Sequence, residues 1–265
     1  MDRPAQRGGK PRPPRADRVQ PIHERELLYG RNAVQEALRG RRRLKRLLLA
    51  EGIHEDERIR QIITAAEKRG LPIVRVPRAE LDRLTRQANH QGVALEAEPY
   101  PYVDFDELTR TPGTLLILDH LQDPQNFGTL LRTAEATGVS GVIVPEDRSV
   151  GVTPAVVNAS AGAVEHLAIA RVTNLPRVIE ALKCAGWWII ALDTGPDAQD
   201  LFRADLPAPV ALVIGAEGVG ISRLVRKLSD LVVQIPMTGK VASLNAATAG
   251  SIALYELFRR QRQAS

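Results

Sequence analysis

The sequence predicts an α/β protein whose larger, C-terminal part is built on a mostly parallel sheet, with a smaller α/β domain before it. Apolar runs of strand length alternate with amphipathic stretches of helix length, which is the pattern of a sheet covered by helices on both faces. A proline-rich, acidic segment interrupts this alternation near residue 100. The 265 residues, 44% hydrophobic and 25% charged, are enough for two domains with cores of their own.

The first 24 residues, MDRPAQRGGKPRPPRADRVQPIHE, are rich in Arg, Pro and Gly and offer almost nothing to bury, so we expect a disordered basic tail over 1–24. Residues 1–46 hold 14 Lys and Arg against 5 Asp and Glu, whereas the remainder holds 22 against 26. This asymmetry favours a polyanionic partner such as RNA. The alternative is a tail that only aids solubility. With 4% aromatic residues, a base-stacking surface is not expected.

Residues 27–100 predict a small α/β domain. LYGRNAVQEALRG (28–40) has helical spacing and ends in glycine, as does EDERIRQIITAAEKRG (55–70). LKRLLLAEG (44–52) and PIVRVP (72–77) are typical of strands, RAELDRLTRQ (78–87) of a helix, and GVALEAEPY (92–100) of an alternating strand. The sequence EPYPYVDFDELTRTPG (98–113) then carries three prolines and a terminal glycine, so we expect a linker over 101–113.

Residues 114–265 predict the second domain. Its six candidate strands are TLLILDHL (114–121), GVIVP (141–145), HLAIARV (166–172), WWIIALD (187–193), PVALVIG (209–215) and LVVQIP (231–236). A final helix is expected over about 244–261. Ligands of such sheets bind beyond the carboxyl ends of the strands. Three of these ends carry unusual loops, DHLQDPQNFG, GAEGVGIS and PMTGKVASLN, and we expect a site where the three meet.

Several common functions are excluded by spacing. GAEGVG (215–220) reads G-x-x-G-x-G, whereas a dinucleotide-binding loop needs G-x-G-x-x-G, so an NAD-dependent enzyme is not favoured. A phosphate-binding P-loop needs Gly where Gln234 stands and Ser or Thr where Val241 stands. The five histidines lack metal-ligand spacing, and no G-x-S-x-G element is present, so neither a metal site nor a serine hydrolase is expected.

The cysteine content and the hydropathy indicate a compartment. The sole cysteine, Cys184, excludes an intrachain disulfide and suggests a reducing environment; we expect it to be a small buried side chain rather than a nucleophile. No apolar run approaches the roughly 20 residues that span a bilayer. The N-terminus has no hydrophobic signal segment. A cytoplasmic protein without a membrane partner is therefore predicted.

Two charged residues at the loops admit both a structural and a functional interpretation. Glu217 follows an apolar strand beside glycines, where its carboxylate would repel phosphate and suit a neutral or cationic part of a ligand; it can equally be an exposed loop residue. Arg132 falls near the start of a predicted helix, where cations are mildly disfavoured. That cost hints at function, although a solvated helix arginine would satisfy the same pattern.

Taken together, the loops resemble the three motifs of the TrmH-type branch of the SPOUT RNA methyltransferases. The matching segments are LDHLQDPQNFGTLLRTAEATGV (118–139), LVIGAEGVGIS (212–222) and IPMTGKVASLNAATAGSIALYE (235–256). YGRNAVQEAL (29–38) and HQGVALE (90–96) resemble the family's N-terminal substrate-binding domain, which is similar to ribosomal protein L30e. The likeness is greatest to the bacterial 23S ribosomal RNA guanosine 2′-O-methyltransferase subgroup.

The resemblance implies S-adenosylmethionine as methyl donor, a trefoil-knotted SPOUT domain, a homodimer and RNA as partner. The family's functional polar residues map onto Asn126, Arg132, Glu217, Ser243 and Asn245. The implied cofactor contacts are Gly215, Ile235 and Leu244, with Leu192, Met237 and Gly218 nearby. The glycines agree physically, because they let the backbone approach a ligand closely.

The predicted function is S-adenosylmethionine-dependent 2′-O-methylation of a guanosine in 23S ribosomal RNA. A ribose hydroxyl is a poor nucleophile at neutral pH and must lose its proton as it attacks. Arginine is normally locked in its protonated form, so we expect Arg132 to bind the RNA phosphate beside the target ribose, with Asn126 orienting it or the ribose. The alternatives are 2′-O-methylation of tRNA and a non-catalytic protein that binds ribosomal RNA during assembly.

Overall fold

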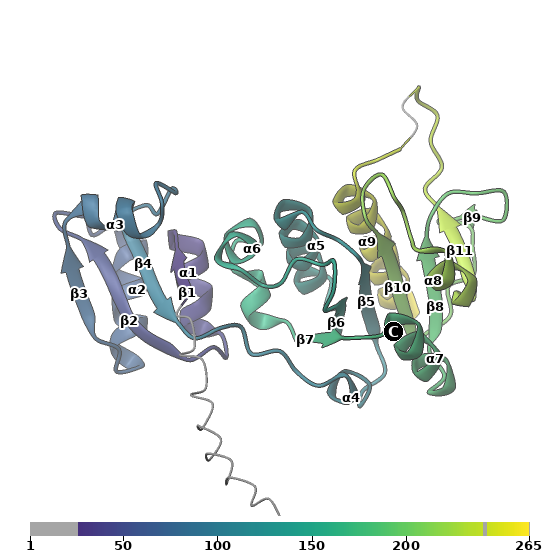
Figure 1. The fold of residues 1–265 in the computed structure, drawn as a ribbon, viewed down its shortest axis with the longest axis horizontal. Helices are drawn as coiled ribbons and strands as arrows, with labels where there is room; N and C mark the ends of the chain where they lie inside the picture. Colours follow the sequence, from purple (N-terminus) through teal and green to yellow (C-terminus); the bar gives the residue numbers. More distant parts are fainter. Residues whose placement is uncertain (1–25, 241–242, 265) are drawn as a thin grey trace, which may run out of the picture.

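The computed structural model describes residues 26–240 and 243–264, and the basic tail predicted over 1–24 lies outside the described residues. Two sheets of different size lie at the two ends of the molecule, and helices occupy the space between them (Figure 1). The prediction of an α/β protein with a smaller N-terminal domain is confirmed.

The first domain contains a four-stranded sheet in the order β1-β4-β2-β3. β4 is antiparallel to both of its neighbours, whereas β2 and β3 are parallel. The strands are β1 (Glu26–Tyr29), β2 (Leu44–Ala50), β3 (Ile73–Val76) and β4 (Val93–Ala97). The helices are α1 (Arg31–Arg39), α2 (Glu57–Lys68) and α3 (Arg78–Leu84).

Local sequence explains the ends of these elements, and the structure corrects one prediction, the start of the first helix. Asp56 caps α2 by accepting a hydrogen bond of 3.0 Å from the backbone N–H of Ile59, and the apolar face of that helix is buried. The prediction of helix from residue 28 was wrong for its first residues: Glu26–Tyr29 form β1, and Gly30, with φ of 85°, turns the chain into α1. A left-handed φ of this kind favours glycine and ends the strand there.

The predicted linker has structure of its own. Residues Phe105–Leu108 form the short helix α4, and Val103 makes an isolated parallel bridge to Ala170 of the large sheet. The chain therefore enters the second domain along that sheet rather than as a free connection.

The second domain contains a seven-stranded sheet in the order β7-β6-β5-β10-β8-β11-β9. Every strand pair recorded within it is parallel, and all six predicted strands are present. The strands are β5 (Thr114–Asp119), β6 (Gly141–Pro145), β7 (Ile169–Val172), β8 (Trp188–Leu192), β9 (Gln199–Asp200), β10 (Val210–Gly215) and β11 (Leu231–Gln234). The two-residue β9 was not predicted.

Helices cover both faces of this sheet, as the continuous apolar strands require. The side chains of Leu116 and Leu118 pack in a cluster with α5, α6 and α9, whereas Leu115 and Ile117 pack in another with α7 and α8. The helices are α5 (Pro124–Ala136), α6 (Pro154–Ala159), the 3-10 turn η1 (Ala163–His166), α7 (Leu175–Cys184), α8 (Arg223–Leu228) and α9 (Ala246–Ala264). β5 is thus buried on both faces.

A buried cation joins the two domains. The guanidinium of Arg42 is fully buried and contacts Glu26 of β1 at 2.6 Å and Glu165 of η1 at 3.1 Å. It also lies 5.4 Å from the ring centroid of Tyr100, whose hydroxyl donates to the carbonyl of Leu167. Burial raises the pKa of the Tyr100 hydroxyl, so that group stays protonated and keeps donating.

Three sequence expectations concern surface and composition. Cys184 is exposed at the end of α7, so the expectation that it is buried was wrong; the helix ends at this residue and turns its last side chain outward. Within the described residues, no helix is long and apolar enough to cross a membrane. The described part of the chain also holds no group of three or more candidate metal-ligating side chains.

Candidate active site

The loop after β5 is shaped by two aspartates. Asp119, almost fully buried, accepts a hydrogen bond of 2.6 Å from the backbone N–H of Ser222 and so fastens the loop after β10 to the end of β5. Asp123 caps α5 through a bond of 2.8 Å from the N–H of Asn126, and Pro124 occupies the first turn, where its missing N–H costs nothing. Together they fix where α5 begins.

Three polar residues from the three loops meet at this point. The amide nitrogen of Asn126 donates to the Glu217 carboxylate at 3.0 Å. Asn245 donates to the amide oxygen of Asn126 at 2.9 Å and to the same Glu217 oxygen at 3.3 Å. The predicted convergence of the loops is thereby realised within one chain.

The two asparagines of this trio are each fixed at the start of a helix, and they in turn hold Glu217. Asn245 caps α9, because its side-chain oxygen accepts from the N–H groups of Ala247 and Thr248 at 3.0 and 3.1 Å. Asn126 is 9% exposed and sits in the capped first turn of α5. Glu217 is exposed and carries no cation partner among the described residues. A carboxylate positioned by two amides is thus left facing outward, where a positively charged group can approach it.

The loop after β10 depends on glycine at two positions for different reasons. A Cβ at Gly215 would stand 2.2 Å from the backbone carbon of Gly220, so only glycine lets the loop fold back on its own strand. Gly218 has a φ of 78° with open space around it, which marks a left-handed turn at the loop tip. The loop is therefore tight at its base and open at its tip.

A cavity of about 370 Å³ lies beside the trio, at the carboxyl ends of β8, β10 and β11. Its lining includes all six residues expected to contact a cofactor: Leu192, Gly215, Gly218, Ile235, Met237 and Leu244. Glu217 and Ser243 line it as well. The size is that of a small-molecule site, and the lining combines apolar and polar residues.

Arg132 is the one predicted functional residue that the structure leaves apart. It lies six residues after Asn126 on α5, about 9 Å further along the helix axis, and its exposed side chain lines a separate cavity between the domains. No carboxylate pairs with it among the described residues. Within one chain, the trio and Arg132 are therefore two separate groups.

Two residues escaped the sequence prediction. Asp193, directly after β8, lines the cavity and accepts a hydrogen bond of 3.0 Å from Arg226 of α8. The buried Asp119 connects the loops of β5 and β10. Both follow apolar strands, and that position at the sheet edge was the available signal. Because their partners are distant in sequence, the pairings could not be predicted from the sequence.

Comparison with known proteins gives two matched regions, which correspond to the two domains of the structure. Residues 113–255 match the model of the SpoU rRNA Methylase family, and residues 27–103 match that of RNA 2′-O ribose methyltransferase substrate binding. A Bacillus subtilis protein named as a TrmH family tRNA/rRNA methyltransferase is 40% identical over 244 residues, which is 90% of this chain and 97% of that protein. A tRNA/rRNA methyltransferase of Synechocystis is 41% identical over 94% of this chain; the match spans 66% of that longer relative.

Solved structures of similar fold cover either nearly the whole chain or a little more than half of it. The SpoU methyltransferase AviRb from Streptomyces viridochromogenes superimposes with a TM-score of 0.77 at 26% identity, over 91% of each chain. An rRNA methyltransferase from Sinorhizobium meliloti, solved with bound AdoMet, gives 0.76 at 27% identity over 89% of this chain and 87% of that one. A structure described as concerning 2′-hydroxyl methylation of tRNA gives 0.51 at 27% identity, over 57% of this chain and 98% of the other.

Proposed function

The chain belongs to the SpoU rRNA methylase family, and from this premise we propose that it methylates the ribose 2′-hydroxyl of a guanosine in 23S ribosomal RNA. At the level of the family, it is an RNA 2′-O-methyltransferase that uses S-adenosylmethionine. The observation that carries the proposal is the joining of Asn126, Glu217 and Asn245 beside a cavity of cofactor size.

The cavity fits S-adenosylmethionine by its chemistry. Ile214, Ile235 and Leu192 offer apolar walls for an adenine ring, while the backbone around Gly215 offers polar groups at close range. The Glu217 carboxylate, which has no cation partner among the described residues, suits the positive charge of the cofactor. When bound, the cofactor supplies a methyl group activated by a neighbouring sulfonium.

The polar residues then position the other reactant. We assign Asn126 and Asn245 to hold the Glu217 carboxylate in one orientation at the mouth of the cavity. Ser243, exposed at the same mouth, has a hydroxyl able to contact the ribose. Arg132 is assigned to an RNA phosphate next to the target ribose, because its charge is permanent and unpaired among the described residues. Such positioning supplies much of the rate in a transfer that needs the reacting atoms in line.

Ribosomal RNA is the favoured substrate over tRNA. The similar structures named for rRNA or as SpoU methyltransferases align with both domains of this chain, whereas the structure concerned with tRNA aligns with 57% of it. The extra N-terminal domain matches a substrate-binding model. A non-catalytic assembly protein would not need the intact trio beside the cavity, so that alternative is not favoured.

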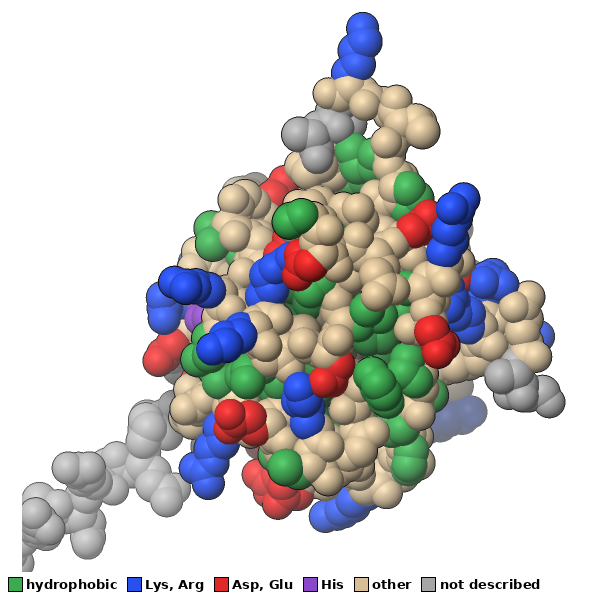
Figure 2. Space-filling view, turned by 90° about the vertical axis from the view of Figure 1, so that its right-hand side faces the viewer, with side chains coloured by type: hydrophobic (Ala, Val, Ile, Leu, Met, Phe, Trp, Pro, Cys, Tyr) green, Lys and Arg blue, Asp and Glu red, His purple; other side chains and the backbone are tan. Residues whose placement is uncertain are grey.

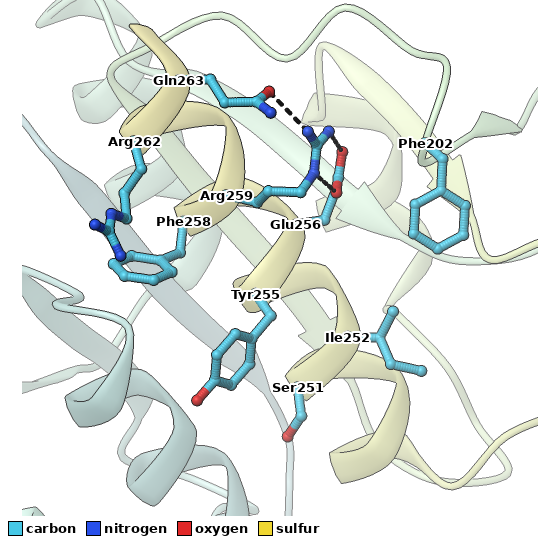
Figure 3. A pocket seen from close by; sticks show the side chains of 9 residues that line it. All are labelled: Phe202, Ser251, Ile252, Tyr255, Glu256, Phe258, Arg259, Arg262 and Gln263. Carbon is cyan, nitrogen blue, oxygen red and sulfur yellow. Dashed lines mark hydrogen bonds and ion pairs between the residues drawn. The ribbon is translucent and has the colours of Figure 1, made fainter. Parts of the chain in front are cut away.

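A homodimer is proposed through α9. One side of this helix borders a shallow groove of about 820 Å³, and Tyr255 and Phe202 are about half exposed there. Figure 2 shows hydrophobic side chains exposed at this end of the molecule, interrupted by acidic and basic ones. Tyr255 and Phe258 stack edge to face along the helix, as drawn in Figure 3. Large apolar groups left open on one helix suit a second copy of the chain.

The test is a methyl-transfer assay with labelled S-adenosylmethionine, offering 23S ribosomal RNA and tRNA separately. The expected product is 2′-O-methylguanosine in digested ribosomal RNA. Label in tRNA alone would keep the reaction and overturn the proposed substrate. No label in either RNA, nor in precursor ribosomal particles, would contradict the proposed function.

A further inference from the structure

Three adjoining cavities run from the first domain to the second. The first, about 560 Å³, is lined by Arg31, Arg58 and Arg78. The second, about 100 Å³, shares Arg31 with it, and the third, about 450 Å³, shares Arg58 with the first and ends at Arg132 of α5. Asn32 lines both the second and the third. The shared lining residues place the three cavities side by side, and we refer to them together as the interdomain groove.

Several arginines of this groove lack the carboxylate partners that other arginines of the first domain have. Many arginines of the first domain have a carboxylate partner, as Arg60 has in Glu57 and Arg83 in Glu80. In the groove, Arg78 and Arg132 have none among the described residues, and Arg58 bonds only to the neutral side chains of Asn32 and Gln35. Their positive charges are therefore available to a ligand.

The acidic residues of the groove offset only part of this charge. Glu36 lines the third cavity but is already paired with Arg39 at 3.0 Å and with His166 at 2.8 Å. Glu135 lines the same cavity and is the other carboxylate there. Arg31 is paired with Asp56, yet its buried Nε has no partner in the described structure.

The positions of these arginines also argue against a role in helix stability. Arg31 and Arg58 stand in the first turns of α1 and α2, where a cation is disfavoured by the helix dipole. Arg58 is nevertheless held in place by its two amide partners. A fixed cation at an unfavourable position is expected where it serves binding rather than folding.

We propose that the interdomain groove binds the sugar-phosphate backbone of the RNA substrate, with Arg78, Arg31 and Arg58 leading the strand to Arg132. This inference rests on the proposed function and adds the path along which the RNA substrate would bind. A run of spaced guanidinium groups recognises successive phosphates without reading bases, which agrees with the scarcity of aromatic side chains in the chain.

The experiment compares matched arginine variants of the full chain. Arg78→Gln and Arg58→Gln remove one charge each from the groove, and Arg83→Gln and Arg60→Gln remove one each from the same two helices outside it. Binding of a labelled RNA hairpin is followed by fluorescence anisotropy between about 50 and 200 mM salt. Thermal unfolding of each variant shows whether it has folded. Arg78 is the cleaner probe, because the described structure gives its side chain no hydrogen bond or ion pair that the substitution would break.

Each groove variant is expected to weaken binding about two- to fivefold and to reduce the slope of log affinity against log salt by about 0.7. The control variants are expected to keep the wild-type slope. Equal slopes in groove and control variants would overturn the proposal. RNA binding is measured separately from methyl transfer. A wild-type chain that is inactive but binds RNA through the groove would contradict the proposed function alone. An active chain whose groove and control variants have equal slopes would contradict the groove proposal alone.

Discussion

At the scale of single residues, the site is defined by which side chains touch and which do not. Asn126, Glu217 and Asn245 form one hydrogen-bonded unit, so the substitution of any one breaks two of its three bonds and leaves a single bond between the other two. Arg132 makes no contact with this unit and has no carboxylate partner among the described residues. Its substitution is therefore the cleaner way to separate RNA positioning from cofactor binding.

Arg132→Ala is expected to lower the rate of methyl transfer by about a hundredfold or more, because a phosphate-positioning charge is lost at the reacting end of the RNA. The affinity for S-adenosylmethionine, measured by calorimetry, should stay within about twofold of wild type. Arg177→Ala is the control, since Arg177 is also an exposed arginine, near the start of α7. Equal losses of transfer and of cofactor affinity would contradict the assignment.

At the scale of elements, α9 links the site to the surface. This helix begins at Asn245, which caps it. The carboxylate of Glu256, one turn before Arg259 and Arg260, accepts hydrogen bonds from both. These bonds, drawn in part in Figure 3, lower the pKa of Glu256 to about 2, the bond to Arg259 being the largest cause. Arg260 in turn donates to the carbonyls of Leu201 and Ala204. Through Arg260, Glu256 therefore connects α9 to the segment that follows β9.

A group with a lowered pKa stabilises the fold above its usual pKa of 4.5, and that contribution is lost as pH falls toward about 2. Glu256→Gln should therefore cost about 1 to 2 kcal/mol of unfolding free energy at neutral pH and progressively less below about pH 4.5. Urea unfolding across that range measures it. Glu180→Gln, at an exposed glutamate of α7, serves as the control. A cost for Glu256→Gln that does not change with pH would contradict the prediction.

Elements were predictable from sequence to the degree that their signals are local. The six main strands of the large sheet follow from apolar runs, and the caps of α5 and α2 from single aspartates. β1 and β9 were missed because they are short edge strands whose pairing partners are distant in sequence. For the site, the residue types came from the resemblance. The bonds that join Asn126 to Glu217 and to Asn245 connect residues 91 and 119 positions apart, and no local pattern encodes such pairings.

At the scale of the whole molecule, the proposed assembly can be tested on the α9 groove. The double variant Phe202→Arg with Tyr255→Arg is expected to be monomeric in light scattering, because it places two charges where an apolar interface would close. Leu224→Arg changes a residue of similar exposure, 53%, on α8 and should remain dimeric. A monomeric wild type, or a dimeric double variant, would contradict the proposed dimer. The trefoil knot stays a prediction.

The order of strands in the large sheet has a consequence for how the protein is made. Thr114 of β5 pairs with Val210 of β10, and β10 lies between β5 and β8, so the centre of the sheet joins segments far apart in the chain. During translation, β5 emerges long before its central neighbour, and the cavity still lacks the loop and helix that follow β11. Non-local pairing of this kind folds slowly. We therefore expect a prematurely ended chain, which lacks part of the proposed donor cavity, not to bind the methyl donor.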